Sequence, residues 1–430
     1  MTFPKFYFDR SFTFESGLHV IYGESGSGKS ALINQILELE KGQEYFHLTN
    51  INRPEEFQKV FQNPDTQIIS STLGGELAFS LECRSNDQEY ISTKLASLKE
   101  KLFFECAEHR HPATLSGGEK EMLNIVTAFS VNPQLLLIDD GLSFLNVNGK
   151  QNMLGYIHNQ IVETNCIVLW LTSDCNDLQF GKTQWELSLS SFNEWNGNIS
   201  PLPAVKHKSQ SNEITIACHD LFFSYNGDRD LFNAFNMKID DFRALGITGS
   251  NGCGKTTLAK LLLHIERSES GSITLTKAGE KAAMAYLEQF PEKMIGADSL
   301  DTFVQRLVMA GKLDKYKINH AVKNLKNCQL EWEQIRYKTA LDLPWSTLRV
   351  VLTIWLLNSE YDLLILDEPT FGLGRQQVLT LTHHLRLYLK NKHLIIISHD
   401  TEFIYTFCDR VFEMDQHTII TEKNNITSNG

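Results

Sequence analysis

The stretch GESGSGKS at residues 23–30 recurs as GSNGCGKT at residues 249–256. Both stretches match the pattern G-x-x-x-x-G-K-[ST], in which the backbone N–H groups of a glycine-rich loop surround phosphates at the start of a helix. An apolar run precedes each copy, LHVIYG in the first case and RALGITG in the second, and predicts a strand that leads into the loop. The pattern therefore predicts two nucleotide-binding sites on two α/β domains.

Three further motifs recur in the same order. LLLIDD is repeated as LLILDE, FQNPD as EQFPE, and LTSD as ISHD. All four motifs share an offset of 226 to 228 residues, measured between Lys29 and Lys255, Gln62 and Gln289, Asp139 and Asp367, and Ser173 and His399. A common offset for four motifs indicates a tandem duplication. We expect a first domain at residues 1–200, a polar linker at 201–213 and a second domain at 214–430.

The composition is typical of a soluble globular protein. The 430 residues are 42% hydrophobic and 21% charged, and the chain is long enough for two or three domains. The net charge of −12 argues against a broad nucleic-acid surface. No apolar run reaches the roughly 18 residues that a membrane span needs. The eight cysteines include no C-x-x-C pair, so neither a disulfide framework nor a zinc site is expected.

Each phosphate loop supplies a lysine for the β- and γ-phosphates and a hydroxyl group for Mg²⁺. These residues are Lys29 and Ser30 in the first half, and Lys255 and Thr256 in the second. Asp139 and Asp367 end buried apolar runs and are expected to support Mg²⁺. A turn aspartate would explain either one alone, but the distance from a phosphate loop favours the metal. The other loop residues expected to bind nucleotide are Gly23, Gly26, Gly28, Gly249, Asn251, Gly252, Gly254 and Thr257.

Between the first phosphate loop and Asp139 lies LSGGE, residues 115–119. With this signature the motif set resembles the nucleotide-binding domains of ABC ATPases, over nearly the whole chain and twice. The resemblance implies ATP and Mg²⁺ as ligands. It also implies that each half has a mainly parallel core sheet, an antiparallel β portion and a helical subdomain that carries the signature. The two halves would pair head to tail within the chain, with each ATP between the phosphate loop of one half and the signature of the other.

This crosswise pairing gives one site with intact motifs. The resemblance implies that Glu368 is the general base and that His399 holds the γ-phosphate and the water in line. Gln289 would bridge the water and Mg²⁺, Lys255 would contact the phosphates, and Tyr225 would stack on the adenine. From the first half, the signature would contribute Ser116, Gly117 and Gly118.

The other site departs from the family pattern. Its signature segment reads LPWST, residues 343–347, so that Pro344 replaces the serine. Asp140 stands in place of the glutamate and is one methylene shorter, and Ser173 stands in place of the histidine. We expect this site to bind nucleotide and to hydrolyse it poorly or not at all. Its expected Mg²⁺ ligands are Ser30, Gln62 and Asp139.

The segment VFQNPDTQIISSTLGGELAFSLEC, residues 60–83, resembles the ATPase subunits of energy-coupling-factor (ECF) importers of vitamins and metal ions. The resemblance implies integral membrane partners, namely a coupling subunit and a substrate-binding subunit, and a peripheral location on the cytoplasmic face of the membrane. The alternative is a soluble tandem ABC ATPase that acts on ribosomes or nucleic acid. The short linker, the acidic balance and the lost signature disfavour it. A purely structural scaffold is disfavoured because Glu368 and His399 are intact.

Overall fold

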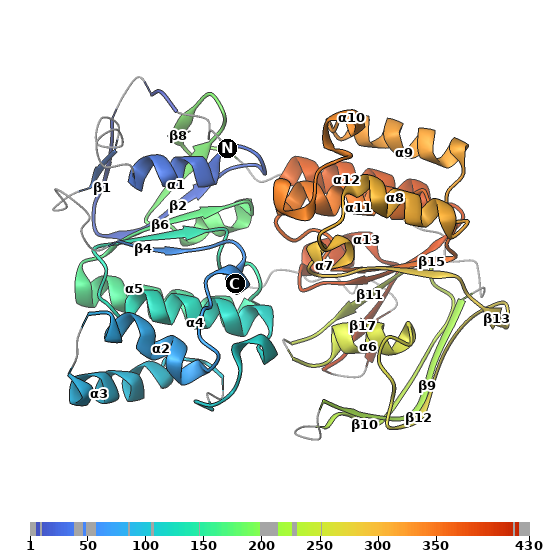
Figure 1. Ribbon diagram of the computed structural model, residues 1–430, viewed down its shortest axis with the longest axis horizontal. Helices are drawn as coiled ribbons and strands as arrows, with labels where there is room; N and C mark the ends of the chain where they lie inside the picture. The colour runs from blue at the N-terminus through green and yellow to red at the C-terminus, as the bar shows by residue number, and fades with distance from the viewer. Residues whose placement is uncertain are drawn as a thin grey trace. The chain divides into compact units, whose positions relative to one another are not determined.

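A computed structural model describes residues 6–8, 11–37, 46–48, 57–84, 87–104, 107–145, 147–197, 214–225, 230–250, 252–415 and 418–420. The chain divides into two compact units (Figure 1). Unit 1 consists of Met1–Ile199 and Gly372–Arg375, and unit 2 of Ser200–Phe371 and Gln376–Gly430. The predicted linker at 201–213 and Asn251 lie outside the described residues.

Each unit is built on a six-stranded sheet, and the two sheets have the same strand order. The order is β4-β5-β6-β2-β7-β8 in unit 1 and β14-β15-β16-β11-β17-β18 in unit 2. All pairings are parallel except the last one in each sheet. This confirms the predicted fold class of two α/β domains with mainly parallel sheets. The strands are β2 Gly17–Tyr22, β4 Phe57–Val60, β5 Leu135–Asp139, β6 Ile167–Thr172, β7 Thr183–Leu187, β8 Phe192–Glu194, β11 Ala244–Thr248, β14 Met284–Leu287, β15 Leu363–Asp367, β16 His393–Ile397, β17 Arg410–Glu413 and β18 Thr418–Ile420.

The central strands are apolar on both faces because helices cover both faces. Every residue of β5 is buried. Leu135 and Leu137 belong to the cluster that contains α1 (Lys29–Leu37), whereas Leu136 and Ile138 belong to the cluster of α4 (Gly117–Phe129) and α5 (Val147–Thr164). Parallel strands buried in this way read as continuous apolar runs rather than as alternating patterns. Such runs are what the sequence shows ahead of Asp139 and Asp367.

The remaining helices lie between the strands, and several follow one another before the strands that end in Asp139 and Asp367. They are α2 Leu73–Glu82, α3 Gln88–Lys99, α6 Lys255–Leu262, α7 Glu292–Ile295, α8 Leu300–Met309, α9 Lys315–Asn327, α10 Trp332–Ile335, α11 Trp345–Leu357, α12 Arg375–Tyr388 and α13 Thr401–Phe407, with short 3₁₀ helices at Pro64–Thr66, Pro112–Thr114, Cys175–Phe180 and Ala340–Asp342. Within the described ranges, none of the helices has both the length and the apolar character of a membrane span.

Smaller sheets accompany the core sheets. In unit 2 a four-stranded antiparallel sheet has the order β10-β9-β12-β13. The alternating burial along β9 shows that one face packs on the core while the other is more exposed. In unit 1 the described residues form a two-stranded parallel sheet, β1-β3. The bounds are β1 Phe12–Phe14, β3 Phe46–Leu48, β9 Ile214–Ser224, β10 Asp230–Ile239, β12 Ser270–Lys277 and β13 Glu280–Lys281.

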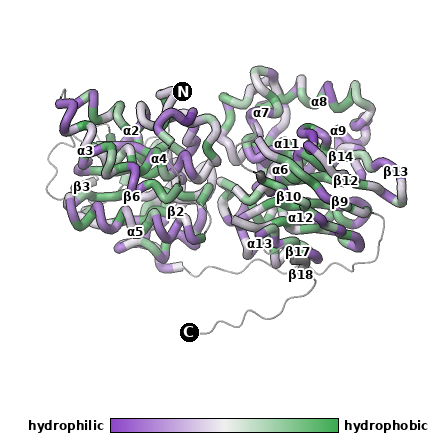
Figure 2. Tube along the Cα trace, turned by 90° about the horizontal axis from the view of Figure 1, so that it is seen from below, coloured by the Kyte–Doolittle hydropathy of each residue, from purple (hydrophilic) through white to green (hydrophobic). Residues whose placement is uncertain are grey.

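Hydrophobic residues lie along the inner strands, and hydrophilic residues gather on outer helices such as α3 and α5 (Figure 2). The cores also take up thiols, because Cys166 and Cys175 are buried in unit 1 and Cys218 is buried in unit 2. The seven cysteines that the structure describes are all unbonded.

Candidate nucleotide-binding sites

Each phosphate loop connects a core strand with a helix. Residues 23–28 join β2 to α1, and residues 249–254 join β11 to α6. Gly28 has φ +93° and Gly254 has φ +102°, which is the left-handed region. A Cβ at these positions would come within 2.5 Å of the Phe6 ring and 2.9 Å of the Phe232 ring. Glycine is therefore required where each loop enters its helix. The predicted residues Gly23, Gly26, Gly249 and Gly252 belong to the same two loops.

In unit 2 the expected Mg²⁺ residues lie together. The Thr256 Oγ1 hydroxyl donates to Asp367 Oδ2 at 2.7 Å, and the Tyr286 hydroxyl donates to the same oxygen at 3.0 Å. Burial and the charge of Glu368 raise the pKa of Asp367 to about 6. The hydrogen-bond donors to this buried carboxylate are neutral hydroxyls. A metal ion can therefore bind it without first displacing another cation from these contacts. The threonine hydroxyl and the Asp367 carboxylate are hard oxygen ligands, so this donor set fits Mg²⁺.

The next residue, Glu368, is fixed by two groups at the end of β16. Its Oε1 atom lies 2.8 Å from His399 Nδ1, and its Oε2 atom accepts a hydrogen bond from Ser398 Oγ at 2.7 Å. Burial would raise the pKa of Glu368, but the contacts with His399 and Ser398 outweigh it and hold the pKa below its usual value. An ionised, oriented carboxylate beside a phosphate loop is what a general base requires.

Arg349, on α11, is a site residue that the sequence analysis missed. It is 1% exposed, and its guanidinium donates to the backbone carbonyl of Glu368 and, at 2.7 Å, to that of Gln289. Its Cζ atom also lies 5.2 Å from the centre of the Phe371 ring. Burial lowers the pKa of Arg349 to about 10, so the group remains charged at neutral pH. One buried cation therefore joins the general base and the glutamine segment to the same helix.

Replacing Arg349 with methionine should destabilise unit 2 and reduce ATP turnover together. Methionine keeps an unbranched apolar stem but lacks the guanidinium, so two backbone carbonyls lose their donor, which should cost about 2–4 kcal/mol of unfolding free energy. Chemical denaturation and steady-state phosphate release measure the two effects. Arg306→Met is the matched control, because Arg306 is largely exposed in its ion pair with Asp298 and should cost less than about 1 kcal/mol. If the Arg349→Met protein were as stable and active as the control, Arg349 would not be needed to hold the Glu368 and Gln289 carbonyls in place.

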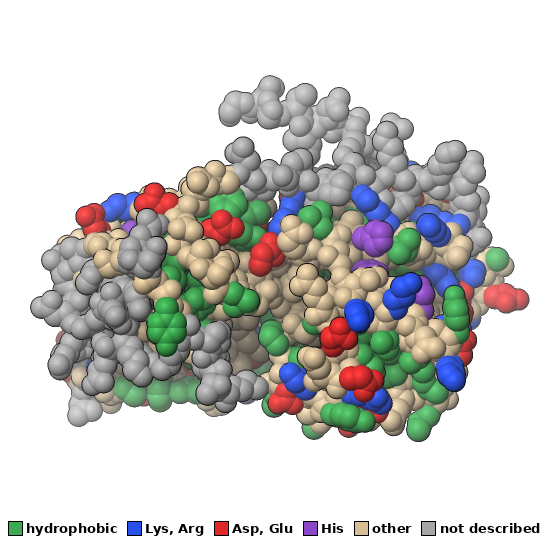
Figure 3. Space-filling model, turned by 90° about the horizontal axis from the view of Figure 1, so that it is seen from above, with side chains coloured by type: hydrophobic (Ala, Val, Ile, Leu, Met, Phe, Trp, Pro, Cys, Tyr) green, Lys and Arg blue, Asp and Glu red, His purple; other side chains and the backbone are tan. Residues whose placement is uncertain are grey.

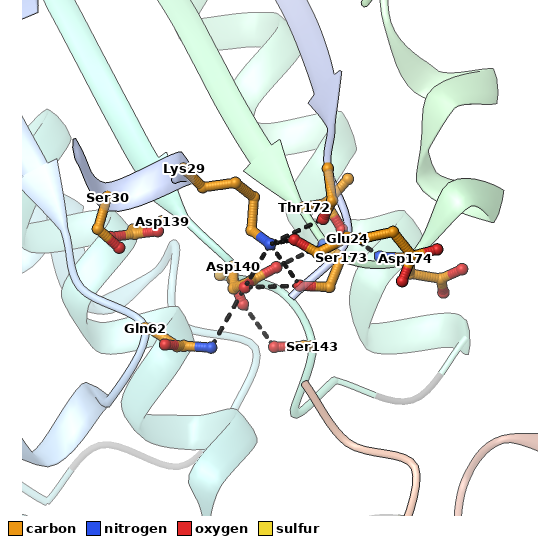
Figure 4. A network of polar contacts seen from close by, with 12 residues as sticks. Glu24, Lys29, Ser30, Gln62, Asp139, Asp140, Ser143, Thr172, Ser173 and Asp174 are labelled. Carbon is orange, nitrogen blue, oxygen red and sulfur yellow. Dashed lines mark hydrogen bonds and ion pairs between the residues drawn. The ribbon is translucent and has the colours of Figure 1, made fainter. Parts of the chain in front are cut away.

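The equivalent residues of unit 1 form a different network (Figure 4). Lys29 Nζ donates to Gly23 O and to Ser173 Oγ, both at 2.8 Å, and lies 3.6 Å from Asp140 Oδ2. Asp140 accepts from the Ser173 backbone N–H at 2.6 Å, from Ser173 Oγ at 2.9 Å and from Gln62 Nε2 at 3.2 Å. The short carboxylate is therefore held among a serine, an amide and the phosphate-loop lysine. The imidazole that contacts the acidic residue in unit 2 has only a hydroxyl as its counterpart here.

The Mg²⁺ position of unit 1 also differs from that of unit 2. Ser30 Oγ donates to Asp139 Oδ2 at 3.0 Å, and Lys59 Nζ lies 3.5 Å from the same oxygen. Burial and the charge of Asp140 raise the pKa of Asp139, while Lys59 opposes this shift. Because the Asp139 carboxylate is already paired with a cation, this donor set fits Mg²⁺ less well than that of unit 2.

The signature residues of unit 1 lie at the N-terminus of a helix. Ser116 is the N-cap of α4, and its Oγ atom accepts from the Glu119 N–H at 3.3 Å. The Ser116 N–H in turn donates to Glu119 Oε2 at 2.7 Å. This reciprocal pair is a capping box, which stabilises the first turn formed by Gly117 and Gly118. The helix end presents backbone N–H groups and the positive end of its dipole.

The corresponding helix of unit 2 begins with different contacts. Pro344 is the N-cap of α11 and makes no side-chain cap. The Trp345 indole donates to Glu292 Oε2 at 2.6 Å, and its ring centre lies 5.5 Å from that of Phe290. The LPWST segment is thus a packed structural element, anchored to the residues that follow Gln289. The pairing of each signature segment with the other unit's phosphate loop stays a prediction.

Tyr225 and Gln289 lie at the edges of the unit 2 site. Tyr225 follows β9, is 45% exposed, and its hydroxyl lies 3.2 Å from Thr257 Oγ1 in the first turn of α6. Its ring is thereby held beside the start of the phosphate-binding helix. Gln289 follows β14, the strand that pairs with the Asp367 strand, as Gln62 follows β4 in unit 1. The roles of these residues toward ATP stay predictions.

The sequence profile of the ABC transporter family matches residues 8–143 and 232–371. Among curated relatives, a provisionally named ABC transporter ATP-binding protein of Streptococcus mutans is 25% identical over 95% of this chain and 86% of its own length. One of Treponema denticola with the same description is 25% identical, over 84% and 78% respectively. The similarity therefore spans both halves of the chain.

Two solved structures match nearly the whole of this chain in fold. One titled RNase-L Inhibitor superposes with a TM-score of 0.61 at 17% identity, and covers 94% of this chain and 84% of its own. One titled as a model of ribosome-bound archaeal Pelota and ABCE1 reaches a TM-score of 0.69 at 18% identity, over 93% and 72%. At 17% and 18% identity, these superpositions are evidence for a shared fold and for nothing beyond it.

Proposed function

Since the chain belongs to the ABC transporter family, as a tandem ABC ATPase, we propose that it hydrolyses ATP to energise a separate membrane transporter. The contact between Glu368 and His399, beside Asp367, carries the ATPase part of the proposal. The transport part is supported by the curated relatives, which are named as transporter ATP-binding proteins.

In this proposal the unit 2 residues divide the work of phosphoryl transfer. Thr256 and Asp367 would hold Mg²⁺, which neutralises charge on the phosphates when bound. Lys255, which donates to the carbonyls of Gly249 and Ser250, would turn its ammonium group to the phosphate oxygens. Glu368 accepts a proton from the attacking water. The His399 ring is oriented through its Nδ1 contact with Glu368, and its Nε2 atom would be the one to contact the γ-phosphate.

Unit 1 is proposed to bind nucleotide and not to turn it over, so Asp140→Asn should cost little. Asparagine tolerates the left-handed backbone of this position, where φ is 50°. Turnover should stay within about twofold of wild type, a change below about 0.5 kcal/mol in activation free energy. Steady-state phosphate release at saturating ATP measures it. A loss as large as that of Glu368→Gln would show that the work is not divided between the sites in this way.

We further propose ECF-type partners, namely an integral coupling subunit and a substrate-binding subunit for a vitamin or metal ion, on the cytoplasmic face of the membrane. Besides the sequence of residues 60–83, exposed apolar side chains on this segment support the proposal. Ile69 is 63% exposed, Phe79 46% and Phe61 42%. Exposed apolar groups gathered on one segment are typical of a protein contact.

Affinity purification of the chain from detergent-solubilised native membranes tests this proposal. Integral membrane proteins in stoichiometric amounts are expected to co-elute, and the substrate-binding one would identify the cargo. Ribosomes or nucleic acid in the eluate would support the soluble alternative instead. On the face drawn in Figure 3, the described Lys and Arg side chains are interspersed with acidic and hydrophobic ones.

A further inference from the structure

We propose that Lys59 is a built-in cation of the unit 1 site, so that this site binds a nucleoside triphosphate with little need for a divalent cation. The inference rests on the proposed function, because it requires that unit 1 binds nucleotide. It concerns a residue outside the phosphate loop and outside every motif that repeats between the two halves.

The strand register places Lys59 and Tyr286 at equivalent positions. Lys59 of β4 is paired with Leu137 of β5, and Tyr286 of β14 is paired with Ile365 of β15. β5 ends at Asp139, two residues after Leu137, and β15 ends at Asp367, two residues after Ile365. Both side chains reach the Oδ2 atom of that aspartate. The two units therefore present different chemistry, an ammonium and a phenol, to the same carboxylate position.

In unit 1 the ammonium and the carboxylate are largely shielded from water. The side chain of Lys59 is 16% exposed and that of Asp139 is 6% exposed, with 3.5 Å between Nζ and Oδ2. The Lys59 ammonium also lies 5.0 Å from the centre of the Phe61 ring, which adds a cation–π contact. Attraction between two charges increases as the effective dielectric falls, so a shielded pair of this kind is held more strongly than a surface pair. The lysine is therefore a resident part of the site.

In unit 2 the same position holds a neutral phenol in place of a cation. The hydroxyl of Tyr286 donates a hydrogen bond to Asp367 Oδ2 at 3.0 Å without bringing a positive charge. A divalent cation approaching Asp367 therefore meets an available negative charge. One approaching Asp139 meets a carboxylate already neutralised, together with the repulsion of a like charge from Lys59.

The ammonium can take over part of the work of the metal. The Lys59 ammonium carries three N–H donors, whereas its ion pair with Asp139 engages the single oxygen Oδ2. A triphosphate in the unit 1 loop would thus be neutralised by Lys29 on one side and Lys59 on the other. Single positive charges on flexible side chains suit binding rather than turnover, which agrees with the absence of an imidazole partner for Asp140 in the unit 1 network of Figure 4.

The test uses the full chain with one site disabled at a time. Lys255→Ala leaves the unit 1 site, and Lys29→Ala leaves the unit 2 site. A fluorescent ATP analogue is titrated into each protein, once with Mg²⁺ and once with excess EDTA. We expect EDTA to raise the Kd less than about threefold for Lys255→Ala and more than about tenfold for Lys29→Ala. An equal rise in both proteins would overturn the inference.

Matched substitutions assign the effect to this position. Adding Lys59→Met to the Lys255→Ala protein removes the charge and keeps the chain length, so EDTA should now raise the Kd more than about tenfold. Adding Tyr286→Lys to the Lys29→Ala protein should have the reverse effect and reduce the dependence on Mg²⁺. The second variant decides the question if circular dichroism shows that the first does not fold. Unchanged EDTA ratios in the folded variants would exclude Lys59 as the cause.

The outcomes separate this inference from the proposed function. Failure of both single-site proteins to bind the analogue with Mg²⁺ would overturn the ATPase function and the inference together. Binding by the Lys29→Ala protein alone would overturn the inference and leave ATP hydrolysis in unit 2 standing. Binding by both, with the same need for Mg²⁺, would also overturn the inference alone.

Discussion

Glu368→Gln is expected to abolish most ATP turnover and to leave ATP binding close to that of the wild type. The amide has the size of the carboxylate; its oxygen can still accept from the His399 backbone N–H, and its NH2 group can donate to the Ser398 hydroxyl, so the local structure should be kept. It cannot take a proton from water. General-base catalysis contributes about 10²–10⁴-fold, and the loss in kcat should fall in this range.

Phosphate release under steady-state conditions and equilibrium binding of a fluorescent ATP analogue measure the two quantities in the same preparation. Asp140→Asn is the matched control, since it neutralises the acidic residue at the equivalent position of unit 1. Near-wild-type hydrolysis by Glu368→Gln would refute the assignment of the general base. A protein that neither binds nor hydrolyses ATP would place Glu368 in binding instead of in the chemical step.

Ser116→Asn should lower turnover at the Glu368 site by about 10²–10³-fold, the effect of removing one stabilising donor. The two residues belong to different units, so this prediction depends on the crosswise pairing of signature and phosphate loop. Asparagine is as good an N-cap as serine, so α4 and its capping box should remain stable. The substitution thus changes the group offered to the γ-phosphate with little change to the helix that carries it.

Thermal unfolding of the Ser116→Asn protein separates lost function from lost structure, because the midpoint should be close to that of the wild type. Pro344→Ser is the reciprocal control in unit 2. It should not increase turnover, because Trp345, Asp140 and Ser173 would remain. Full activity of Ser116→Asn would reject the crosswise pairing, and a gain of activity in Pro344→Ser would reject the division into an active and an inactive site.

The residues that set the fold were predictable because their signals are local. A glycine-rich loop needs particular residues within a few positions, as the left-handed Gly28 and Gly254 show. A strand buried on both faces must be largely apolar, as β5 and β15 are up to the aspartate that ends each of them. The repetition of such local signals at one offset predicted two similar α/β domains, and the sheets have the same strand order.

The sequence alone also showed that the two sites differ in their motif residues, because the difference consists of residue identities at fixed motif positions. Proline has no hydroxyl, and aspartate is one methylene shorter than glutamate, wherever the chain places them. The structure adds what these replacements contact. Trp345 is anchored to Glu292, and Asp140 is enclosed by Lys29, Ser173 and Gln62.

Only the tertiary structure decided the roles of Arg349 and Lys59. Arg349 lies in an apolar helix, and its partners are backbone carbonyls of Gln289 and Glu368, which no side-chain pattern records. Lys59 reads as an ordinary strand residue until the register of β4 and β5 places it beside Asp139. The free energy of a buried charge depends on which partners the fold brings within a few ångströms, and those partners are 19 to 80 residues away in the chain.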